Sequence, residues 1–445
     1  MENQSEPTPV AETLPWYHSP TFIFVVALTL RLAVLGLGHT YRINPRGDHF
    51  QFGWEMGRIA RSLALGQGFS SPIDVPTGPS AWTPPLYPFI LAAIFKVFGI
   101  YSHASAWIIL AFNSLFGALT CFTIHKIGDR IYGPGVARAA SWTWAVFPYM
   151  IYWPVRVVWE TSLSAFLLSL ALLATIRMAD RPPRTRAWLW FGFLWGIIAL
   201  TNTALLSMLP FLLLWVLYRS EHRLREFAQM CFCGLVIVAI IAPWLARHYS
   251  VFGKFIFIRD NLPLELEVAN NQNSDGLWTR REHPGNDPES MRRFQELGEL
   301  GFMQEKQQEF RQFVRNHPDR FAAFTLKRAL YFWIGTPQNA TVGGHNLLPL
   351  RHLSFFLASA LAFLGLWISW RKHKFAVFLF ACFLIIYPLP YYLVYPFPRY
   401  KHAIEPEMIL LIVYAIWEMR ARLNSPGRAG TWLQDGTRPL NATMR

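Results

Sequence analysis

Charged residues are scarce in this chain of 445 residues. Asp, Glu, Lys and Arg make up 15% of it, against roughly a quarter of an ordinary soluble domain. Hydrophobic residues make up 53%, and they gather in long runs rather than at the periods of amphipathic helices or strands. These runs approach the roughly 17 to 25 residues that a membrane-spanning helix needs. The composition therefore excludes a string of soluble domains and indicates an integral membrane protein.

Cysteine is equally scarce, with four residues in the whole chain. Cys121, Cys231, Cys233 and Cys382 all fall within apolar runs. Cys231 and Cys233 are two positions apart, and a helix points such residues in different directions. The cysteine pattern therefore predicts neither a disulfide framework nor a zinc site.

Acidic residues are outnumbered, 27 against 41 Lys and Arg, which gives a formal charge of +14. In a soluble chain this balance would suggest a nucleic-acid partner. Here most of the charges lie in short segments between apolar runs, where they orient helices in the bilayer. No zinc-finger, basic-zipper or RNA-binding motif is present, so we expect no nucleic-acid partner.

The apolar runs predict an all-α membrane fold of about ten spanning helices. The predicted spans are residues 21–38, 105–124, 138–154, 160–176, 187–201, 203–218, 228–246, 353–370, 375–395 and 405–421. The short basic segments are residues 126–138, 177–186, 219–225 and 371–374 and the tail from residue 420. With ten spans, all of these segments face the cytoplasm, as the positive-inside rule requires.

One further apolar run, residues 86–98, is predicted not to cross the membrane. It is too short to span, it contains Lys96, and it begins beside Pro84, Pro85 and Pro88. We expect it to form an interfacial or re-entrant helix.

This topology divides the chain into five parts. Residues 1–20 form a cytoplasmic disordered N-terminus without the features of a cleaved signal peptide, and residues 422–445 form a disordered cytoplasmic tail. Residues 21–246 form a transmembrane catalytic module that includes the first outer loop, residues 39–104. Residues 247–352 form a large outer loop, and residues 353–421 form the C-terminal helices.

Both outer segments are expected to contain helices. In the first, apolar residues recur at helical spacing, which predicts an amphipathic helix on the membrane surface; these residues are Phe52, Met56, Ile59, Ala60 and Leu63. In the second, a helix is expected from about residue 288 to 315, followed by a second helical stretch. Together they would form a small, partly helical cap.

Asp48 lies just beyond the outer end of the first span, where water meets lipid. Because Asp is a good helix N-cap, it could simply cap the surface helix that follows. Its neighbourhood at the outer face also makes it a candidate for chemistry, and the sequence leaves both interpretations open.

Glu160 is a second acidic residue at the outer end of a span, and Arg156 precedes it by four positions. If the helix is continuous, the two side chains share a face and could form a structural ion pair. Ionisable residues at membrane depth are also functional candidates, because burying them is costly.

Basic residues gather before the last span, where Arg399, Lys401 and His402 follow one another closely. Three potential cations on the outer face predict an anion site, although lipid head groups would also explain them. Arg247, after the seventh span, is a fourth such cation, unless it only extends towards the interface.

Two polar residues interrupt apolar runs. Arg31 lies near the middle of the first span, so it must face a partner or a cavity. Asn202 separates two short helices and could line a cavity, although a hydrogen bond between helices explains it more simply.

Taken in order, several segments resemble the polytopic C-type glycosyltransferases, of the branch that includes protein O-mannosyltransferases and the aminoarabinose transferases of lipid A. The segments are GDHFQFGWEMGRIARSLALGQGFS, WTPPLYPFILAAIFKVFG, RVVWETSLSAFLLSLAL, APWLARHYSVFGKFIFI with Asn270 and Asn271 following, and RYKHAIEPEMILLIVYAI. The resemblance extends over about residues 20 to 420.

This resemblance implies transfer of a sugar from a polyprenyl phosphate on the outer face, with inversion. It implies Asp48 as the carboxylate that deprotonates the acceptor, and Glu160 as the second acidic position. Arg399 is the first choice for the cation on the phosphate, followed by Arg247 and Arg156, with Lys401 and His402 as further candidates.

Two departures from the family pattern bear on the ligands. Thr83 stands where many relatives carry a basic residue before the two prolines, and His49 stands where a second acidic residue often follows the Asp. Asp48 with His49 is a poor ligand set for a metal, so we expect neither a metal nor another cofactor.

The expected partners are the lipid-linked donor, membrane lipids, and an acceptor that is a lipid, a glycan or a protein. The expected location is the bacterial inner membrane, with the site on its periplasmic face. The alternative is a transporter or flippase for a lipid-linked saccharide, in which Arg31, Arg156 and Glu160 would line the path.

Overall fold

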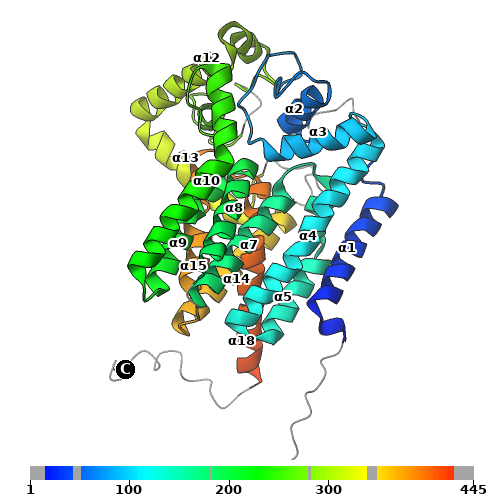
Figure 1. Cartoon of the computed structure of the whole chain (residues 1–445), viewed down its shortest axis with the longest axis vertical. Helices are drawn as coiled ribbons and strands as arrows, with labels where there is room; N and C mark the ends of the chain where they lie inside the picture. Colours follow the sequence, from blue (N-terminus) through cyan, green and yellow to red (C-terminus); the bar gives the residue numbers. More distant parts are fainter. Residues whose placement is uncertain (1–15, 44–51, 181–182, 279–281, 338–347, 425–445) are drawn as a thin grey trace, which may run out of the picture.

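The computed structural model describes residues 16–43, 52–180, 183–278, 282–337 and 348–424. Within these ranges the chain is a bundle of helices with a second group of helices at one end (Figure 1). We call this end of the bundle the outer end, because the two predicted outer segments lie there. The described residues contain no strand, only an isolated bridge between Ser70 and Pro79.

The bundle is built from α1 and α4 to α10, followed by α14 to α18. Their bounds are α1 Pro20–Leu37, α4 His103–Tyr132, α5 Pro134–Val146, α6 Pro148–Arg156, α7 Thr161–Asp180, α8 Thr185–Thr201, η2 Thr203–Met208, α9 Leu209–Arg219, α10 Arg223–Phe252, α14 Leu348–Arg371, α15 Val377–Ile385, α16 Leu389–Leu393, α17 Pro398–His402 and α18 Glu405–Leu423.

The helix bounds confirm the all-α membrane fold class predicted from the sequence. Within the described ranges, five helices are long and apolar enough to cross a membrane by themselves: α1, α4, α7, α10 and α14. Several other predicted spans consist of two pieces, such as α5 with α6 and α15 with α16. The residues predicted as disordered ends lie largely outside the described ranges, although Trp16–His18 form a short 3-10 helix, η1.

Arg31 finds its partners where one of these spans breaks. Helix α5 ends just before Phe147 and α6 begins at Pro148, so the last carbonyls of α5 lack partners within their helix. Arg31 is fully buried, and its guanidinium donates to the carbonyls of Trp144 at 3.1 Å and Ala145 at 3.0 Å. A cation at the C-terminus of a helix also opposes the negative end of the helix dipole. Arg31 therefore has a structural role.

Helix α4 lies at the centre of the N-terminal half, where it packs against α1, α5 and α7. At the end opposite the outer segments, Arg130 at the end of α4 forms an ion pair with Asp180 at the end of α7, with 2.6 Å between Nη2 and Oδ1. Charged residues thus lie at this end of the bundle.

The first outer segment forms two packed helices, α2 Trp54–Ala64 and α3 Leu86–Phe98. Figure 1 shows both at the outer end of the bundle. The predicted apolar stripe is confirmed, because Met56, Ile59 and Ala60 are buried. Helix α3 occupies the run that was predicted not to cross the membrane.

The second outer segment forms α11 Leu262–Ala269, α12 Pro288–Asn316 and α13 Pro318–Ile334. Helix α12 confirms the predicted helix, and α13 is the second helical stretch. This cap is joined to the first segment through Ala81, whose N–H donates to Glu299 Oε1 at 2.5 Å and whose carbonyl accepts from the N–H of Asp260 at 3.0 Å. The two outer segments therefore form one packed layer.

Candidate functional site

Glu160 lies in the short connection between α6 and α7, at the outer end of the bundle. Its side chain is 7% exposed. One carboxylate oxygen accepts a hydrogen bond from Asn202, with 3.3 Å between Nδ2 and Oε1. Asn202 itself stands where α8 ends and η2 begins, and its own Oδ1 caps η2 by accepting from the N–H of Ala204. Two interruptions of the helical backbone are therefore joined by one side-chain hydrogen bond.

Arg399 approaches the same place from α17, near the other end of the sequence. Its guanidinium carbon lies 4.4 Å from the ring centre of Trp159, 4.6 Å from that of Phe397 and 5.0 Å from that of Tyr400. Its Nη2 also donates to the Tyr400 hydroxyl at 3.3 Å. Aromatic faces attract a cation without neutralising it. Arg399 is thus held in place while its charge stays available to an anion.

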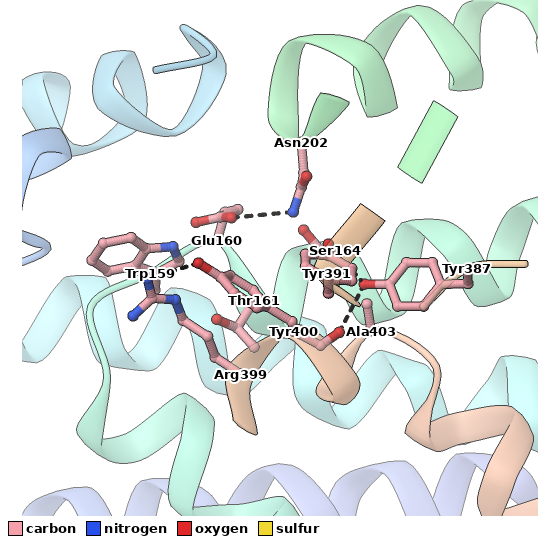
Figure 2. A pocket seen from close by; sticks show the side chains of 10 residues that line it. All are labelled: Trp159, Glu160, Thr161, Ser164, Asn202, Tyr387, Tyr391, Arg399, Tyr400 and Ala403. Atoms are coloured by element: carbon pink, nitrogen blue, oxygen red, sulfur yellow. Dashed lines mark hydrogen bonds between the residues drawn. The ribbon is translucent and has the colours of Figure 1, made fainter. Parts of the chain in front are cut away.

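Glu160, Asn202 and Arg399 line one small cavity (Figure 2). The full lining consists of Trp159, Glu160, Thr161, Ser164, Asn202, Tyr387, Tyr391, Arg399, Tyr400 and Ala403. In Figure 2 the guanidinium of Arg399 lies beside the Trp159 ring, and the Glu160 carboxylate points towards Asn202. The cavity volume is about 10 Å³, which is close to what one ordered water needs. A larger ligand therefore requires these side chains to move apart.

Burial controls the charge of this cluster. It raises the pKa of Glu160 to about 7, and the positive charges of Arg399 and Arg259 oppose this shift. A carboxyl group with this pKa is partly protonated at neutral pH. Such a perturbed group in a cavity is a candidate for function.

Glu55 is a half-buried carboxyl group whose charge acts on Arg399. Burial raises the pKa of Glu55 to about 7, and the charge of Glu265 raises it further, whereas Arg58 and Arg399 lower it. His283 lies 3.7 Å from Glu55, but burial lowers the pKa of His283 to about 4, so its ring is neutral and gives no ion pair. The sequence did not predict Glu55, because its electrostatic effect on Arg399 arises only through the fold.

Asp48 and its neighbour His49 lie outside the described residues. The described chain resumes at Phe52, whose ring is fully buried and packs against Tyr101 at 5.0 Å between ring centres. Helix α2 follows at Trp54 and carries Glu55. The catalytic role of Asp48 therefore stays a prediction from the sequence.

The prediction that Arg156 and Glu160 share one face of a continuous helix is wrong. Helix α6 ends at Arg156, and the chain leaves the helical path at Val157 before α7 begins at Thr161. Arg156 is exposed, whereas Glu160 is buried. Because the helix is not continuous, the four-residue spacing does not bring the two side chains together.

Arg247 does not line the cavity and is engaged elsewhere. It donates to the backbone carbonyls of Ser80 at 2.6 Å and Phe69 at 2.9 Å. It also stacks on Phe69 and Trp244. These contacts attach the end of α10 to the first outer segment. Arg247 thus stabilises the packing of these two parts and does not line the cavity with Arg399.

The expected cluster of Arg399, Lys401 and His402 is also divided. Lys401 is buried with its Nζ 4.0 Å from the ring centre of Phe355. His402 forms an ion-pair contact with Glu405 at 2.6 Å and stacks on Trp144. Of these three residues only Arg399 lines the cavity, because Lys401 packs on Phe355 and His402 is engaged by Glu405 and Trp144.

Among the described residues, no three His, Cys, Asp or Glu side chains are grouped so as to hold a metal ion.

The amino-acid sequence matches a protein-family model. Residues 82–246 match the family described as dolichyl-phosphate-mannose-protein mannosyltransferase. This range includes Glu160 and Asn202, and it ends next to Arg247. No curated protein sequence matches the chain.

Solved structures give weaker similarities. The oligosaccharyltransferase of Archaeoglobus fulgidus, in complex with Zn and sulfate, is 12% identical with a TM-score of 0.49, over 91% of this chain and 50% of that one. The same enzyme with a tethered acceptor peptide is 13% identical with a TM-score of 0.46, over 93% of this chain and 51% of that one. ArnT from Cupriavidus metallidurans bound to undecaprenyl phosphate is 13% identical with a TM-score of 0.41, over 91% of this chain and 80% of that one. The chain thus spans about half the length of the archaeal enzyme.

The family match agrees with the resemblance found in the sequence, and it falls on the segment that supplies one wall of the cavity. The bundle and its outer layer agree with the predicted membrane architecture. Residues 82–246 of this polytopic membrane protein are thus similar to that mannosyltransferase family.

Proposed function

We propose that this chain transfers a sugar from a polyprenyl phosphate to an acceptor at the outer end of the bundle. The observation that carries the proposal is that Arg399 and the buried carboxyl group of Glu160 line one cavity, whose other wall lies in the matched family segment. The name of that family includes dolichyl phosphate mannose, a mannose linked to a polyprenyl phosphate. The same match favours transfer over the transporter alternative.

In this proposal the phosphate of the donor binds Arg399. The guanidinium offers a planar set of donors that matches phosphate oxygens. When the bond between the anomeric carbon and the phosphate oxygen breaks, negative charge grows on the leaving phosphate, and a fixed cation stabilises that charge. The aromatic rings around Arg399 hold the cation without consuming its charge.

Asp48 is the proposed general base. It accepts the proton from the acceptor hydroxyl or amine while the acceptor atom forms its bond to the anomeric carbon. Attack from the side opposite the phosphate inverts the configuration at that carbon. General-base catalysis of this kind contributes roughly 100-fold to 10,000-fold. The protonation state of Glu160 determines whether a negative charge lies near Arg399.

The proposed location is the bacterial inner membrane, with the outer end of the bundle in the periplasm. The placement rests on the positive-inside rule, because Arg130 and Lys372 lie at the opposite end. The second outer segment forms the part of the layer from which a polar acceptor enters.

The test is transfer of radiolabel from a panel of polyprenyl-phosphate sugars by the full chain in native membranes. Asp48→Asn keeps the size of the side chain and removes its charge. Asp74→Asn is the matched control, because Asp74 is an exposed residue of the same outer segment. We expect Asp48→Asn to reduce transfer at least about 100-fold and Asp74→Asn to retain it.

Equal transfer by wild type and a folded Asp48→Asn variant would show that Asp48 is a cap and not the base. Labelled donor that crosses the bilayer intact, without transfer to any acceptor, would instead support the transporter alternative.

A further inference from the structure

A second, larger cavity lies at the end of the bundle opposite the candidate site. Its volume is about 310 Å³, within the range of small-molecule pockets. Its polar and aromatic lining residues are Trp16, His18, Ser19, His125, Asp129 and Arg138, which come from η1, α1, α4 and α5. In Figure 1 this is the lower end of α1, beside α4 and α5. The positive-inside rule places it at the cytoplasmic surface.

The cavity lining carries one charge of each sign. Arg138 supplies the positive charge, and its Nη1 donates to His18 Nδ1 over 3.0 Å. Because His18 accepts at Nδ1, the neutral ring carries its proton on Nε2, which remains a donor. The exposed Asp129 supplies the negative charge. The formal charges of Arg138 and Asp129 in the lining cancel.

Two helices begin at this cavity, and their N-termini add positive potential to that of Arg138. Helix α1 starts after Ser19 and α5 starts after Gly133, and neither helix has a side-chain cap for its first N–H groups. The first residues, Pro20 and Pro134, both line the cavity, but as prolines they have no backbone N–H to donate. The positive ends of the two helix dipoles lie at the cavity and favour a phosphate there. Together with Arg138, they give the cavity a phosphate-binding side.

Aromatic side chains place the cavity at the depth of lipid head groups. Trp16 is 70% exposed and Tyr17 is 45% exposed. Trp16 also packs edge-on against Phe22, with 4.5 Å between ring centres. Exposed Trp and Tyr at helix ends concentrate at membrane interfaces, where their rings contact both lipid and water. The cavity therefore opens where a phospholipid head group is at hand.

We propose that this cavity binds the phosphoethanolamine head group of a membrane phospholipid. The phosphate lies against Arg138, His18 and the two helix starts, and the primary ammonium group donates to Asp129. Phosphoglycerol carries no positive charge to meet Asp129. Phosphocholine carries a quaternary ammonium that has no N–H to donate. A lining of zero formal charge thus selects the zwitterion with a hydrogen-bonding ammonium.

The test uses native mass spectrometry of the full chain, released from micelles that hold phosphatidylethanolamine, phosphatidylcholine and phosphatidylglycerol with identical acyl chains. We expect phosphatidylethanolamine to be retained preferentially. Arg138→Gln should lower its retention about 10-fold or more, the loss expected for one charge-assisted hydrogen bond. Asp129→Asn should remove the preference for ethanolamine over choline.

Matched controls remove the same charges elsewhere at this end of the bundle. Lys126→Gln and Glu221→Gln change exposed side chains outside the cavity lining and should keep the wild-type preference. Unfolding temperatures of all four variants show whether each remains folded. A second pair, Arg138→Lys and Asp129→Glu, keeps the charges and should retain part of the preference if either first variant fails to fold.

A soluble competitor separates the two sources of this head group. If O-phosphoethanolamine displaces the lipid only weakly, the ligand is the phospholipid, as proposed. If it binds as well as the lipid does, the head-group chemistry is correct but the ligand is a soluble phosphate ester. Equal retention of all three lipids, or a preference that survives both charge-removing substitutions, would overturn the proposal.

Discussion

The side-chain amide of Asn202 donates to the Glu160 carboxylate at 3.3 Å, across two places where the helical backbone is interrupted. Interrupted backbone within a membrane protein is tolerated where it lines a cavity or is buried in protein. Both interruptions border the cavity that also contains Arg399. The two breaks in the helices therefore form part of the wall of the candidate site.

Substitution of Arg399 should impair the use of the donor. Arg399→Gln removes the charge, and we expect kcat/KM for the lipid-linked sugar to fall about 100-fold, the usual cost of losing one fixed donor to a developing anion. Arg399→Lys keeps the charge but loses the flat group that stacks on Trp159, so it should recover only part of the activity. Initial rates at varied donor concentration measure both.

Lys401→Gln is the matched control for Arg399, because Lys401 lies in the same short helix but outside the cavity. A folded Lys401→Gln variant should keep the wild-type KM for the donor. A loss as large as that of Arg399→Gln would contradict the separation of these two cations in the structure.

The pH dependence of donor binding should report on Glu160. Burial raises the pKa of Glu160 to about 7, so the carboxyl group is neutral below that pH and ionised above it. The ionised form competes with a phosphate for Arg399, and we expect KM for the donor to rise as pH passes 7. Glu160→Gln should remove most of this rise. A wild-type KM that is flat between pH 6 and 8, about one unit either side of that pKa, would be inconsistent with this competition.

Glu55 provides a second check on the same effect. Burial raises the pKa of Glu55 to about 7 as well, and Glu55 also acts on Arg399. The pH dependence left in Glu160→Gln should therefore disappear in the double variant with Glu55→Gln. If the single and double variants behave alike, Glu55 has no influence on the donor.

Arg31 should matter for stability and not for substrate affinity. Arg31→Met leaves the buried carbonyls of Trp144 and Ala145 without these donors, which should cost about 2 kcal/mol or more of unfolding free energy. Val25→Ala, on the exposed side of the same helix, is the control and should change stability little. Thermal unfolding in detergent compares the two, and equal unfolding temperatures would refute the capping role.

The joint between the two outer segments should weaken as pH rises. Burial raises the pKa of Asp260 to about 6, and burial together with the charge of Asp260 holds the pKa of Glu299 well above its ordinary range. Carboxyl groups with raised pKa values bind more protons when folded than when unfolded, so stability falls as pH rises from about 4 through the folded pKa values.

Hydrogen exchange measures this effect at Ala81, whose N–H donates to Glu299. After correction for the intrinsic effect of pH on exchange, protection of this amide should decrease from pH 5 to pH 8, a range that spans the raised pKa of Asp260. Glu299→Gln removes the carboxyl group whose pKa is raised and should flatten the profile. Unchanged protection across this range in the wild type would show that the pair does not control the joint.

The sequence predicted the helices well because hydropathy is local. The run at 288–315 and α12, and the first span and α1, agree within one or two residues. The expected Arg156–Glu160 face failed for a local reason as well, since α6 contains Pro154 and ends at Arg156. Proline removes a backbone donor and disrupts the helix around it.

The site itself depends on contacts that no local pattern contains. Arg399 was predicted from its basic neighbours, yet those neighbours turn away from the cavity and pack against Phe355 and Glu405. The aromatic support from Trp159 and the influence of Glu55 arise only when distant segments meet. An apolar run predicts that a helix exists, but it does not predict which helices are neighbours.

The distribution of the cavity wall along the chain has a consequence for biosynthesis. Glu160 and Asn202 are made early, whereas Arg399 arrives with α17, just before the last helix. The ribosome synthesises the N-terminal helices first. A nascent chain therefore contains Glu160 and Asn202 before Arg399 has been made. The charge set for a phosphate is complete only after almost the whole protein has been synthesised, so premature termination yields chains that lack this cation.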